Sequence, residues 1–393
     1  MFRYRIAYCT TLAAAILFYL FFNGYLSFFT FVFVLLLPFI SWLFTLLAVL
    51  KTTVWLEMKS PVANKNEEFI LSIILKNTSI FPIARSRVKI CCVNSLCGVK
   101  QNETLFLPVN ARAEQIVEHR MQSQYCGKIT TELTQIKYYD YLGIFTIKRN
   151  LSVCAETFVL PKMQFIDAQI DTATNISVES STYSKVKPGD DPSEIFDIRP
   201  FRGGDRLRSI HWKLSSKLDE LMVKEFSLPT DSEVLLLTEL LAPDMPMLDT
   251  LVDVLATLSH FLTENQINHR IEWFDSKNSQ FNEETIESDE DLAVLMNAVL
   301  SAGSYRDEPH ALACRNKLDG IAHDYPHAIY ITGRLSGELT EFCDRPNGEK
   351  TTVLYVCGEA DSEQEKLGLN TMNAAVVKIQ PGKIQECLSG VIL

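Results

Sequence analysis

Residues 6–50 read IAYCTTLAAAILFYLFFNGYLSFFTFVFVLLLPFISWLFTLLAVL, and this stretch decides the fold. Residues 6–22 are almost unbroken hydrocarbon, and residues 28–50 form a longer apolar run interrupted by Pro38, Ser41 and Thr45. A helix needs about 20 apolar residues to cross a bilayer, so each run predicts a transmembrane helix. A cleavable signal peptide is the alternative for the first run, but Asn23-Gly24 predicts a tight turn where a cleavage site would be needed.

The short connection between the two runs predicts a helical hairpin whose outer ends lie on the same side of the membrane. Arg3 and Arg5 precede the hairpin, Lys51 and Lys59 follow it, and the inner turn carries no charge. The positive-inside rule therefore predicts a two-span cell-membrane protein with both termini and all soluble domains in the cytoplasm. A sensor of anionic lipid head groups built on Lys51 and Lys59 is a weaker alternative, because two charges are too few for stable recruitment.

Composition narrows the function classes. The chain has 393 residues and a formal net charge of −11, which argues against nucleic acid as a partner because phosphate binding needs a basic face. Its ten cysteines are scattered and form no C-x-x-C pair, so we expect reduced thiols in a cytosolic compartment. A zinc site built from Cys91, Cys97 and a distant histidine is the alternative.

After the hairpin domain (residues 1–51), residues 52–165 show a hydrophobic period of two. The pattern predicts strands at 69–75, 85–90, 104–107, 114–121, 127–138 and 144–147. Short strands at this spacing are typical of an antiparallel β-sandwich of immunoglobulin-like type.

The next segment (residues 166–226) contains SSTYSKVKPGDDPSEIFDIRPFRGGDRLRSIHWKLSSKLDELMVKEF at positions 180–226. Asp191, Pro192 and Glu194 have the spacing of N-cap, N1 and N3 of a short helix. Asp205 predicts the cap of a second helix, and residues 220–226 predict a strand. The apolar face of that second helix would consist of Leu207, Ile210, His211, Leu214 and Leu218.

Charged and aromatic residues are unusually dense in this segment: Arg199, Arg202, Arg206, Arg208, His211, Trp212, Lys213 and Lys217 stand among Asp190, Asp191, Asp197 and Asp205. One interpretation is an ion-paired, hydrogen-bonded structural knot. A second is an anion- or partner-binding surface that uses arginine forks. A third is a hydrolase or transferase site that uses the His211, Asp205 and arginine cluster on an envelope precursor or phosphate-bearing substrate, although no known catalytic motif supports it.

The segment resembles the signature of the bacterial family catalogued as domain of unknown function 58. The matching residues are Gly204, Asp205, Arg208, Ile210, Trp212, Lys213, Ser215, Ser216, Leu221, Val223, Lys224, Glu225 and Phe226. Upstream, Cys126-Gly127-Lys128, Val159-Leu160-Pro161 and the turn at residues 140–145 also fit, so the resemblance covers nearly the whole chain. We therefore predict a binding site at Arg199, Gly204, Asp205, Arg208, His211, Trp212, Lys213, Lys224 and Glu225.

Residues 227–393 alternate strands with helices. Strands are predicted at 233–237, 270–274, 328–332, 353–356 and 375–379, with helices at 247–264, 291–301 and 310–323, which is typical of a doubly wound α/β sheet. The resemblance implies a von Willebrand A-like domain, in which Asp-x-Ser-x-Ser after the first strand holds magnesium. This chain has Thr238-Glu239-Leu240-Leu241-Ala242 there, and Thr332-Gly333 replaces a later Thr-Asp. We therefore predict a degenerate site at Thr238 and Glu239 with no metal and no cofactor.

Together these features predict a multidomain, membrane-anchored interaction or scaffold protein of the bacterial cell envelope that is not an enzyme. The resemblance implies a partner, because members of this family often accompany MoxR-type AAA+ ATPases and membrane proteins with transglutaminase-like domains.

Overall fold

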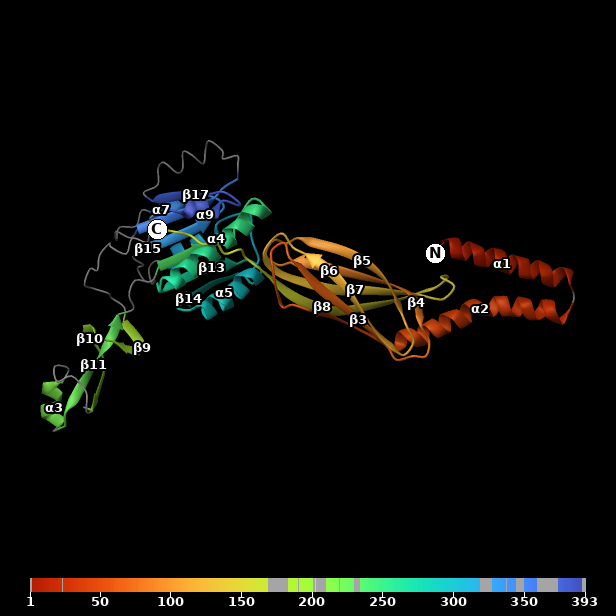
Figure 1. The fold of residues 1–393 in the computed structure, drawn as a ribbon, viewed down its shortest axis with the longest axis horizontal. Coiled ribbons are helices and arrows are strands. Elements are labelled where there is room, and N and C mark those ends of the chain that lie inside the picture. The colour runs from red at the N-terminus through yellow and green to blue at the C-terminus, as the bar shows by residue number, and fades with distance from the viewer. Residues whose placement is uncertain are drawn as a thin grey trace. The chain divides into compact units, whose positions relative to one another are not determined.

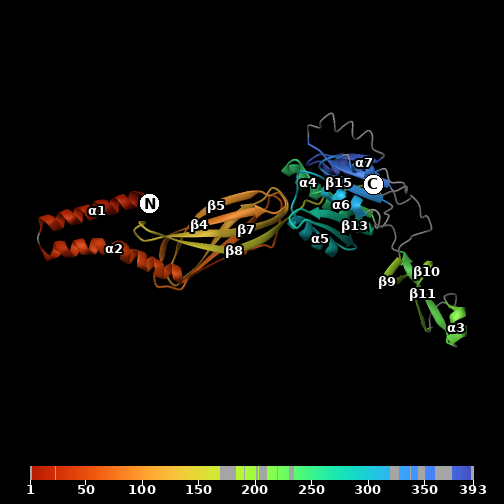
Figure 2. The ribbon, with the colours of Figure 1, turned by 180° about the vertical axis from the view of Figure 1, so that it is seen from behind.

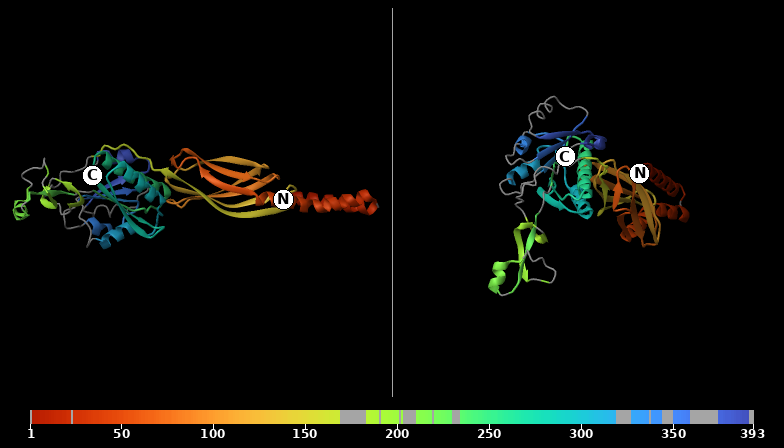
Figure 3. Two further views of the ribbon diagram at one scale, coloured as in Figure 1. Left: turned by 90° about the horizontal axis from the view of Figure 1, so that it is seen from below. Right: turned by 60° about the vertical axis from the view of Figure 1, so that its left-hand side comes forward.

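The computed structural model describes residues 2–22, 24–168, 183–189, 191–200, 202, 210–218, 220–229, 234–318, 327–336, 338–343, 350–358 and 374–390. They belong to two compact units. The first comprises Met1–Lys162 with Asp275–Asn278 and Val294–Tyr305, and the second holds the rest. Figure 1, Figure 2 and Figure 3 show the ribbon from several sides.

Two apolar helices, α1 (Phe2–Phe21) and α2 (Tyr25–Leu50), form a hairpin at the start of the chain (Figure 2). The rings of Tyr19 and Phe31 stack across it at 5.6 Å. Three of the described helices are long and apolar enough to cross a membrane, namely α1, α2 and α4 (Met245–Glu264). Their most apolar windows are 6%, 28% and 72% buried within the protein, respectively, which makes α4 a core helix and leaves α1 and α2 as the candidate membrane spans.

The two helices lead into two β-sheets of the same unit. One sheet has the strand order β1-β3-β6, and the other has the order β2-β8-β7-β4-β5. All pairs are antiparallel except β2 with β8. Five of the six strands that the period of two predicted are confirmed, and the sixth, predicted at 144–147, covers only the start of β8. β1 and β2 were not predicted. The bounds are β1 (Thr52–Met58), β2 (Val62–Asn64), β3 (Glu68–Asn77), β4 (Ile83–Asn94), β5 (Lys100–Val109), β6 (Ala113–Gln122), β7 (Gly127–Tyr139) and β8 (Thr146–Leu160).

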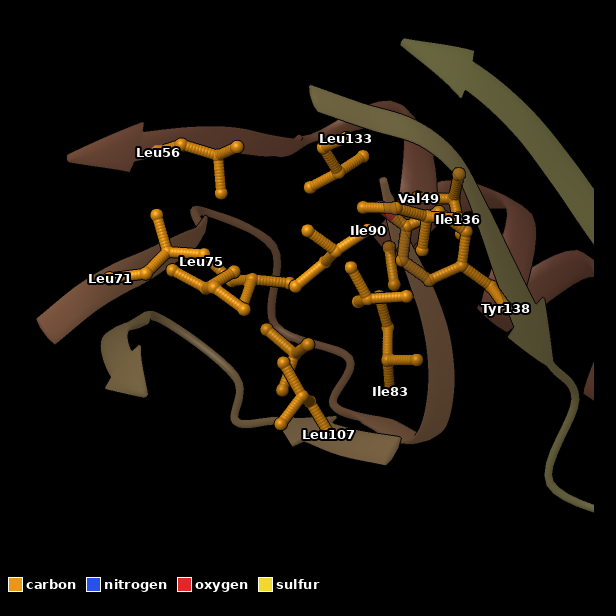
Figure 4. Packing of buried hydrophobic residues seen from close by; sticks show 14 of the residues in the cluster. Val49, Leu56, Leu71, Leu75, Ile83, Ile90, Leu107, Leu133, Ile136 and Tyr138 are labelled. Atoms are coloured by element: carbon orange, nitrogen blue, oxygen red, sulfur yellow. The ribbon is translucent and has the colours of Figure 1, made fainter. Parts of the chain in front are cut away.

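One hydrophobic core joins both sheets to the end of α2. Leu71 and Leu75 from β3 meet Leu133 and Ile136 from β7 in this core, as Figure 4 shows. Val49 and Ala48, near the end of α2, belong to the same cluster. One face of the last turns of α2 is therefore packed by protein, while Leu43, Leu47 and Leu50 remain exposed.

The segment that carries the predicted signature forms a small antiparallel sheet in the order β10-β11-β9. Its elements are β9 (Tyr183–Gly189), β10 (Asp191–Pro200), α3 (Trp212–Leu218) and β11 (Met222–Pro229). The strand predicted at 220–226 is confirmed, but the short helix predicted to start at Asp191 is wrong. Residues 191–200 pair instead with β11, some thirty positions later along the chain. Cross-strand pairing overrides the local capping pattern, and Pro192 is tolerated because β10 is an edge strand.

The C-terminal part contains a six-stranded sheet in the order β14-β13-β12-β15-β16-β17. Neighbours are parallel from β13 through β17, as predicted for a doubly wound α/β arrangement. The polar β14 escaped prediction because its sequence lacks a buried apolar run. The strands are β12 (Val234–Thr238), β13 (His269–Asp275), β14 (Gln280–Ile286), β15 (His327–Thr332), β16 (Lys350–Val356) and β17 (Ala375–Ile379), and the remaining helices are α5 (Asp289–Ser301), α6 (His310–Leu318), α7 (Glu338–Cys343) and α9 (Ile384–Leu388).

Candidate functional site

His211 is the N-cap of α3. Its Nδ1 accepts a hydrogen bond from the backbone N–H of Leu214 at 3.2 Å, which satisfies one of the donors that a helix start leaves unpaired. Its own backbone N–H donates to the carbonyl of Met222 at 2.8 Å, which ties the helix start to β11. The predicted helix from Asp205 thus begins later than expected, at Trp212. An enzymatic role for His211 through Nδ1 would break this cap.

Ser215 fastens α3 to β11 from the next turn. Its buried hydroxyl donates to the carbonyl of His211 at 3.1 Å and accepts from the N–H of Met222 at 2.9 Å. One step away, Ile210 forms an isolated β-bridge with Val223, and both side chains are buried. These signature positions therefore have a structural role, because they hold the helix against the strand.

The cations of this segment lie nearer the surface. Lys213 and Lys217 are exposed on α3, four residues apart and so on one face of the helix. Lys224 is half-buried on β11 and lies opposite Ile198 of β10. Arg199 is also half-buried, and its guanidinium donates to the carbonyl of Pro200 at 3.2 Å.

Several predicted site residues have no described position. Gly204, Asp205 and Arg208 lie outside the described residues, and so do the side chains of Trp212 and Glu225. The structure thus brings His211, Lys213 and Lys224 into one module with Arg199, and the pairing of His211 with Asp205 stays a prediction.

A second candidate site is the carboxyl edge of the six-stranded sheet. The strand order reverses between β12 and β15, and open α/β sheets bind their ligands outside the carboxyl ends of the strands at such a point. The residues here are Thr238, Glu239, Thr332 and Gly333, the positions at which the sequence predicted a degenerate metal site.

Glu239 closes this edge by capping α6. Its carboxylate is fully buried and accepts from the backbone N–H of Ala311 at 2.9 Å and of Leu312 at 3.1 Å. The Tyr330 hydroxyl donates to the same carboxylate at 3.4 Å. A carboxylate at a helix N-terminus is favourable because it satisfies unpaired N–H groups and the helix dipole. Glu239 therefore caps the N-terminus of α6 with its carboxylate.

Gly333 occupies the other predicted ligand position. Its N–H donates to the carbonyl of Leu241 at 3.2 Å, and a Cβ at this position would lie 2.7 Å from that oxygen. An aspartate therefore does not fit in this backbone arrangement. The Thr332 hydroxyl is also engaged, because it donates to the carbonyl of Arg334 at 2.8 Å.

Sequence reasoning missed the ion pair beneath α6. Arg315 Nη1 lies 2.9 Å from Glu272 Oε1, and both side chains are buried. Breaking such a pair leaves an uncompensated buried charge, so it holds α6 in a fixed place. The two residues are 43 positions apart, and no local pattern links them.

The described part of the chain offers few features that could bind a metal ion or a small ligand. Across these residues, no group of three or more His, Cys, Asp or Glu side chains is placed to hold a metal ion. A cavity of about 130 Å³ adjoins α4, which is smaller than the 300–1,000 Å³ typical of ligand pockets. Its lining comes from residues 163–166 and from Thr257, His260, Phe261 and Glu264.

No family model matches the chain. The uncharacterized protein YeaD of Bacillus subtilis (strain 168) is 20% identical over 184 residues, which make up 47% of this chain and 45% of YeaD. The match thus spans less than half of that relative.

Among solved structures, the CARDB domain of a Pyrococcus furiosus protein, crystallised with di-metal ions, covers 28% of this chain and 89% of its own, with 12% identity and a TM-score of 0.21. The sporulation control protein Spo0M of Bacillus subtilis covers 28% of this chain and 50% of its own, with 9% identity and a TM-score of 0.19. Likenesses at this level carry no conclusion about fold or function.

Proposed function

We propose that this chain is a membrane-anchored scaffold that binds a protein partner and performs no catalysis of its own. The observation that carries this proposal is the closed carboxyl edge of the six-stranded sheet. The buried Glu239 carboxylate there is bound to α6, and Gly333 contacts Leu241. With that edge filled by the protein's own groups, the outer surface of the domain is left for recognition.

We propose that the chain is a member of the family known as domain of unknown function 58. Two mainly antiparallel sheets over one core support an immunoglobulin-like assignment for residues 52–165. The strand order of the C-terminal sheet supports a von Willebrand A-like assignment for residues 227–393. Filling of its usual metal position by Glu239 and Gly333 supports a degenerate form of that domain.

We propose that the soluble domains face the cytoplasm. The Arg5 guanidinium donates to the carbonyl of Ile144 at 3.1 Å, so the start of α1 lies beside the β-sheets that follow α2. This contact supports a hairpin with both outer ends on one side of the membrane. The excess of Arg3, Arg5, Lys51 and Lys59 at those ends supports the cytoplasmic side.

We propose that the partner is a MoxR-type AAA+ ATPase, with a transglutaminase-like membrane protein as the second candidate. The surface of α3 is the proposed contact, because Lys213 and Lys217 are exposed on one face while Ser215 is anchored beneath them. An exposed basic face favours an acidic partner surface and speeds the encounter with it.

Affinity purification of the full chain from detergent-solubilised membranes tests the partner. We expect an AAA+ ATPase among the recovered proteins, and we expect Lys213→Glu with Lys217→Glu to reduce its recovery. Lys383→Glu is the matched control, because Lys383 is also exposed but lies at the start of α9. Equal recovery with both sets of variants, or recovery of no partner, would count against the proposal.

A further inference from the structure

The turn between β7 and β8 is fastened to the second membrane helix. Asp140 is buried, and its Oδ2 accepts a hydrogen bond from the Ser41 hydroxyl of α2 at 3.1 Å. The Ser41 oxygen in turn accepts from the N–H of Tyr141 at 3.1 Å, and Asp140 Oδ1 accepts from the N–H of Phe145 at 2.8 Å. This carboxylate therefore organises the turn and binds it to α2 at the same time.

The same turn contacts the first membrane helix. Arg5 donates to the carbonyl of Ile144, and the Tyr4 ring covers Gly143, whose Cβ position would lie 3.2 Å from that ring. Gly143 has φ +69°, a conformation that favours glycine. The turn at residues 140–145 thus binds both helices at one level, and we call this arrangement the clasp.

The distance from the clasp to the far end of the hairpin is short for a bilayer. At 1.5 Å per residue, α2 rises about 25 Å from Tyr25 to Ser41, and α1 rises about the same from Arg5 to Phe21. The hydrocarbon core of a bilayer is about 30 Å thick. If the hairpin spans the whole core, the clasp must lie at the hydrocarbon boundary and cannot stand clear of it in water.

The surface around the clasp suits that position. Ile80, in the neighbouring turn between β3 and β4, is 59% exposed, while Tyr141 and Phe145 are 42% and 38% exposed. The two turns are joined, because the Tyr141 hydroxyl donates to the carbonyl of Pro82. Phe81 of the first turn stacks on Phe44 of α2 at 4.5 Å. Tyr141 is an aromatic side chain with one polar end, the type that is enriched at the membrane–water interface.

A groove along α1 continues from the clasp toward the hairpin turn. It is a shallow, open hollow of about 490 Å³, and its lining residues recur at helical spacing on one face: Phe2, Arg5, Ile6, Cys9, Thr10 and Ala13. Only Arg5, at the clasp, is charged. An apolar groove with a cation at one end suits a phospholipid, with its acyl chain along the helix and its phosphate near the arginine.

We propose that the turns at residues 78–82 and 140–145 insert into the phospholipid interface beside the hairpin, so that Ile80, Tyr141 and Phe145 contact lipid directly. The β-sheet domain is then a third membrane contact of the protein, held at a fixed depth by the Ser41–Asp140 hydrogen bond. This inference depends on the membrane hairpin and is independent of the protein partner.

Tryptophan fluorescence of the full chain in phosphatidylcholine nanodiscs tests the insertion. Ile80→Trp places a probe on the first turn, and Val99→Trp is the matched control. Val99 is 43% exposed in the turn between β4 and β5, at the opposite end of β4 and about 35 Å from the clasp by strand rise. The unchanged chain has four tryptophans, so its emission is subtracted from that of each variant to isolate the probe.

We expect dibrominated phosphatidylcholine to quench the Ile80→Trp probe at least about twofold more than the Val99→Trp probe, while aqueous acrylamide shows the reverse order. If Ile80→Trp is as accessible to acrylamide and as insensitive to bromine as Val99→Trp, the insertion is wrong. Phe145→Trp provides a second probe on the other turn, and far-UV circular dichroism confirms that each variant is folded. Because only lipid and chain are present, a failure here is distinct from failure to bind a partner.

Discussion

The Tyr8 hydroxyl of α1 donates a hydrogen bond to the backbone carbonyl of Val34 in α2 at 3.2 Å. Val34 lies four residues before Pro38, and proline has no N–H to return to that carbonyl. Inside a bilayer no water can satisfy the freed oxygen, so a side chain of the facing helix must do so. A hydrogen bond as well as packing therefore joins the two helices of the hairpin at this point.

This match predicts a non-additive pair of substitutions. Tyr8→Phe should weaken the hairpin by about 0.6 kcal/mol and by no more than about 1.7 kcal/mol, the mean and the maximum for side-chain hydrogen bonds between membrane helices. In a Pro38→Ala background the restored N–H can bind the Val34 carbonyl, so the cost of Tyr8→Phe should be smaller. Reversible unfolding of the full chain in bicelles gives all four free energies, and an equal cost in both backgrounds would contradict the assignment.

Gly333 predicts a steric cost in the C-terminal domain. Gly333→Ala brings a Cβ within 2.7 Å of the Leu241 carbonyl, so we expect a loss of about 1–3 kcal/mol in the free energy of unfolding. Gly358→Ala is the control, because its nearest contact is Met247 Sδ at 4.0 Å. Thermal unfolding of both variants measures this cost. Similar melting temperatures would show that the carboxyl edge of the six-stranded sheet has room for a side chain at position 333.

His269 predicts a loss of stability in acid. Burial lowers its pKa below the usual value, and the neutral ring is held between the Ser259 hydroxyl at 2.7 Å and the Ile267 carbonyl at 3.1 Å. The unfolded chain takes up this proton near pH 6.5 and the folded chain only at lower pH, so stability is complete above about pH 6.5 and falls as the pH decreases.

Denaturant titrations of the full chain at several pH values below neutrality measure this effect. We expect His269→Gln to be less stable than the unchanged chain at neutral pH and to show a shallower decline in acid. An unchanged acid slope in the variant would assign the decline to other groups.

Substitution of Ser215 tests whether the signature segment has a structural role or a binding role. Ser215→Ala removes the hydroxyl that joins His211 and Met222, and a lost buried hydrogen bond costs about 1–2 kcal/mol. Hydrogen exchange of the α3 amides should therefore accelerate about tenfold, whereas exposed Lys217→Ala should leave it unchanged. If Ser215→Ala leaves exchange unaltered, the helix is held by other contacts.

Local periodicity was sufficient to predict the hairpin, most of the strands of residues 52–165 and the parallel sheet. It failed where partners are distant in sequence. The helix predicted at Asp191 is a strand because β11 pairs with it, and the Ser41–Asp140 hydrogen bond joins positions 99 residues apart.

The candidate site shows the same limit. The sequence identified Glu239 as a residue without the partners that a metal would need, but its role as the cap of α6 depends on where that helix begins in space. His211 was assigned to the apolar face of a helix, and it caps the helix instead. Both roles are backbone interactions, which residue type alone does not predict.

Binding of a purified MoxR-type AAA+ ATPase from the same organism to the full chain in nanodiscs tests the scaffold proposal most directly. The account predicts saturable binding that weakens at least about tenfold, or 1.4 kcal/mol, when Lys213 and Lys217 are both changed to Glu, while Lys383→Glu binds as the unchanged chain does. Absence of binding by the folded, unchanged chain, or an equal loss with the Lys383 control, would contradict it.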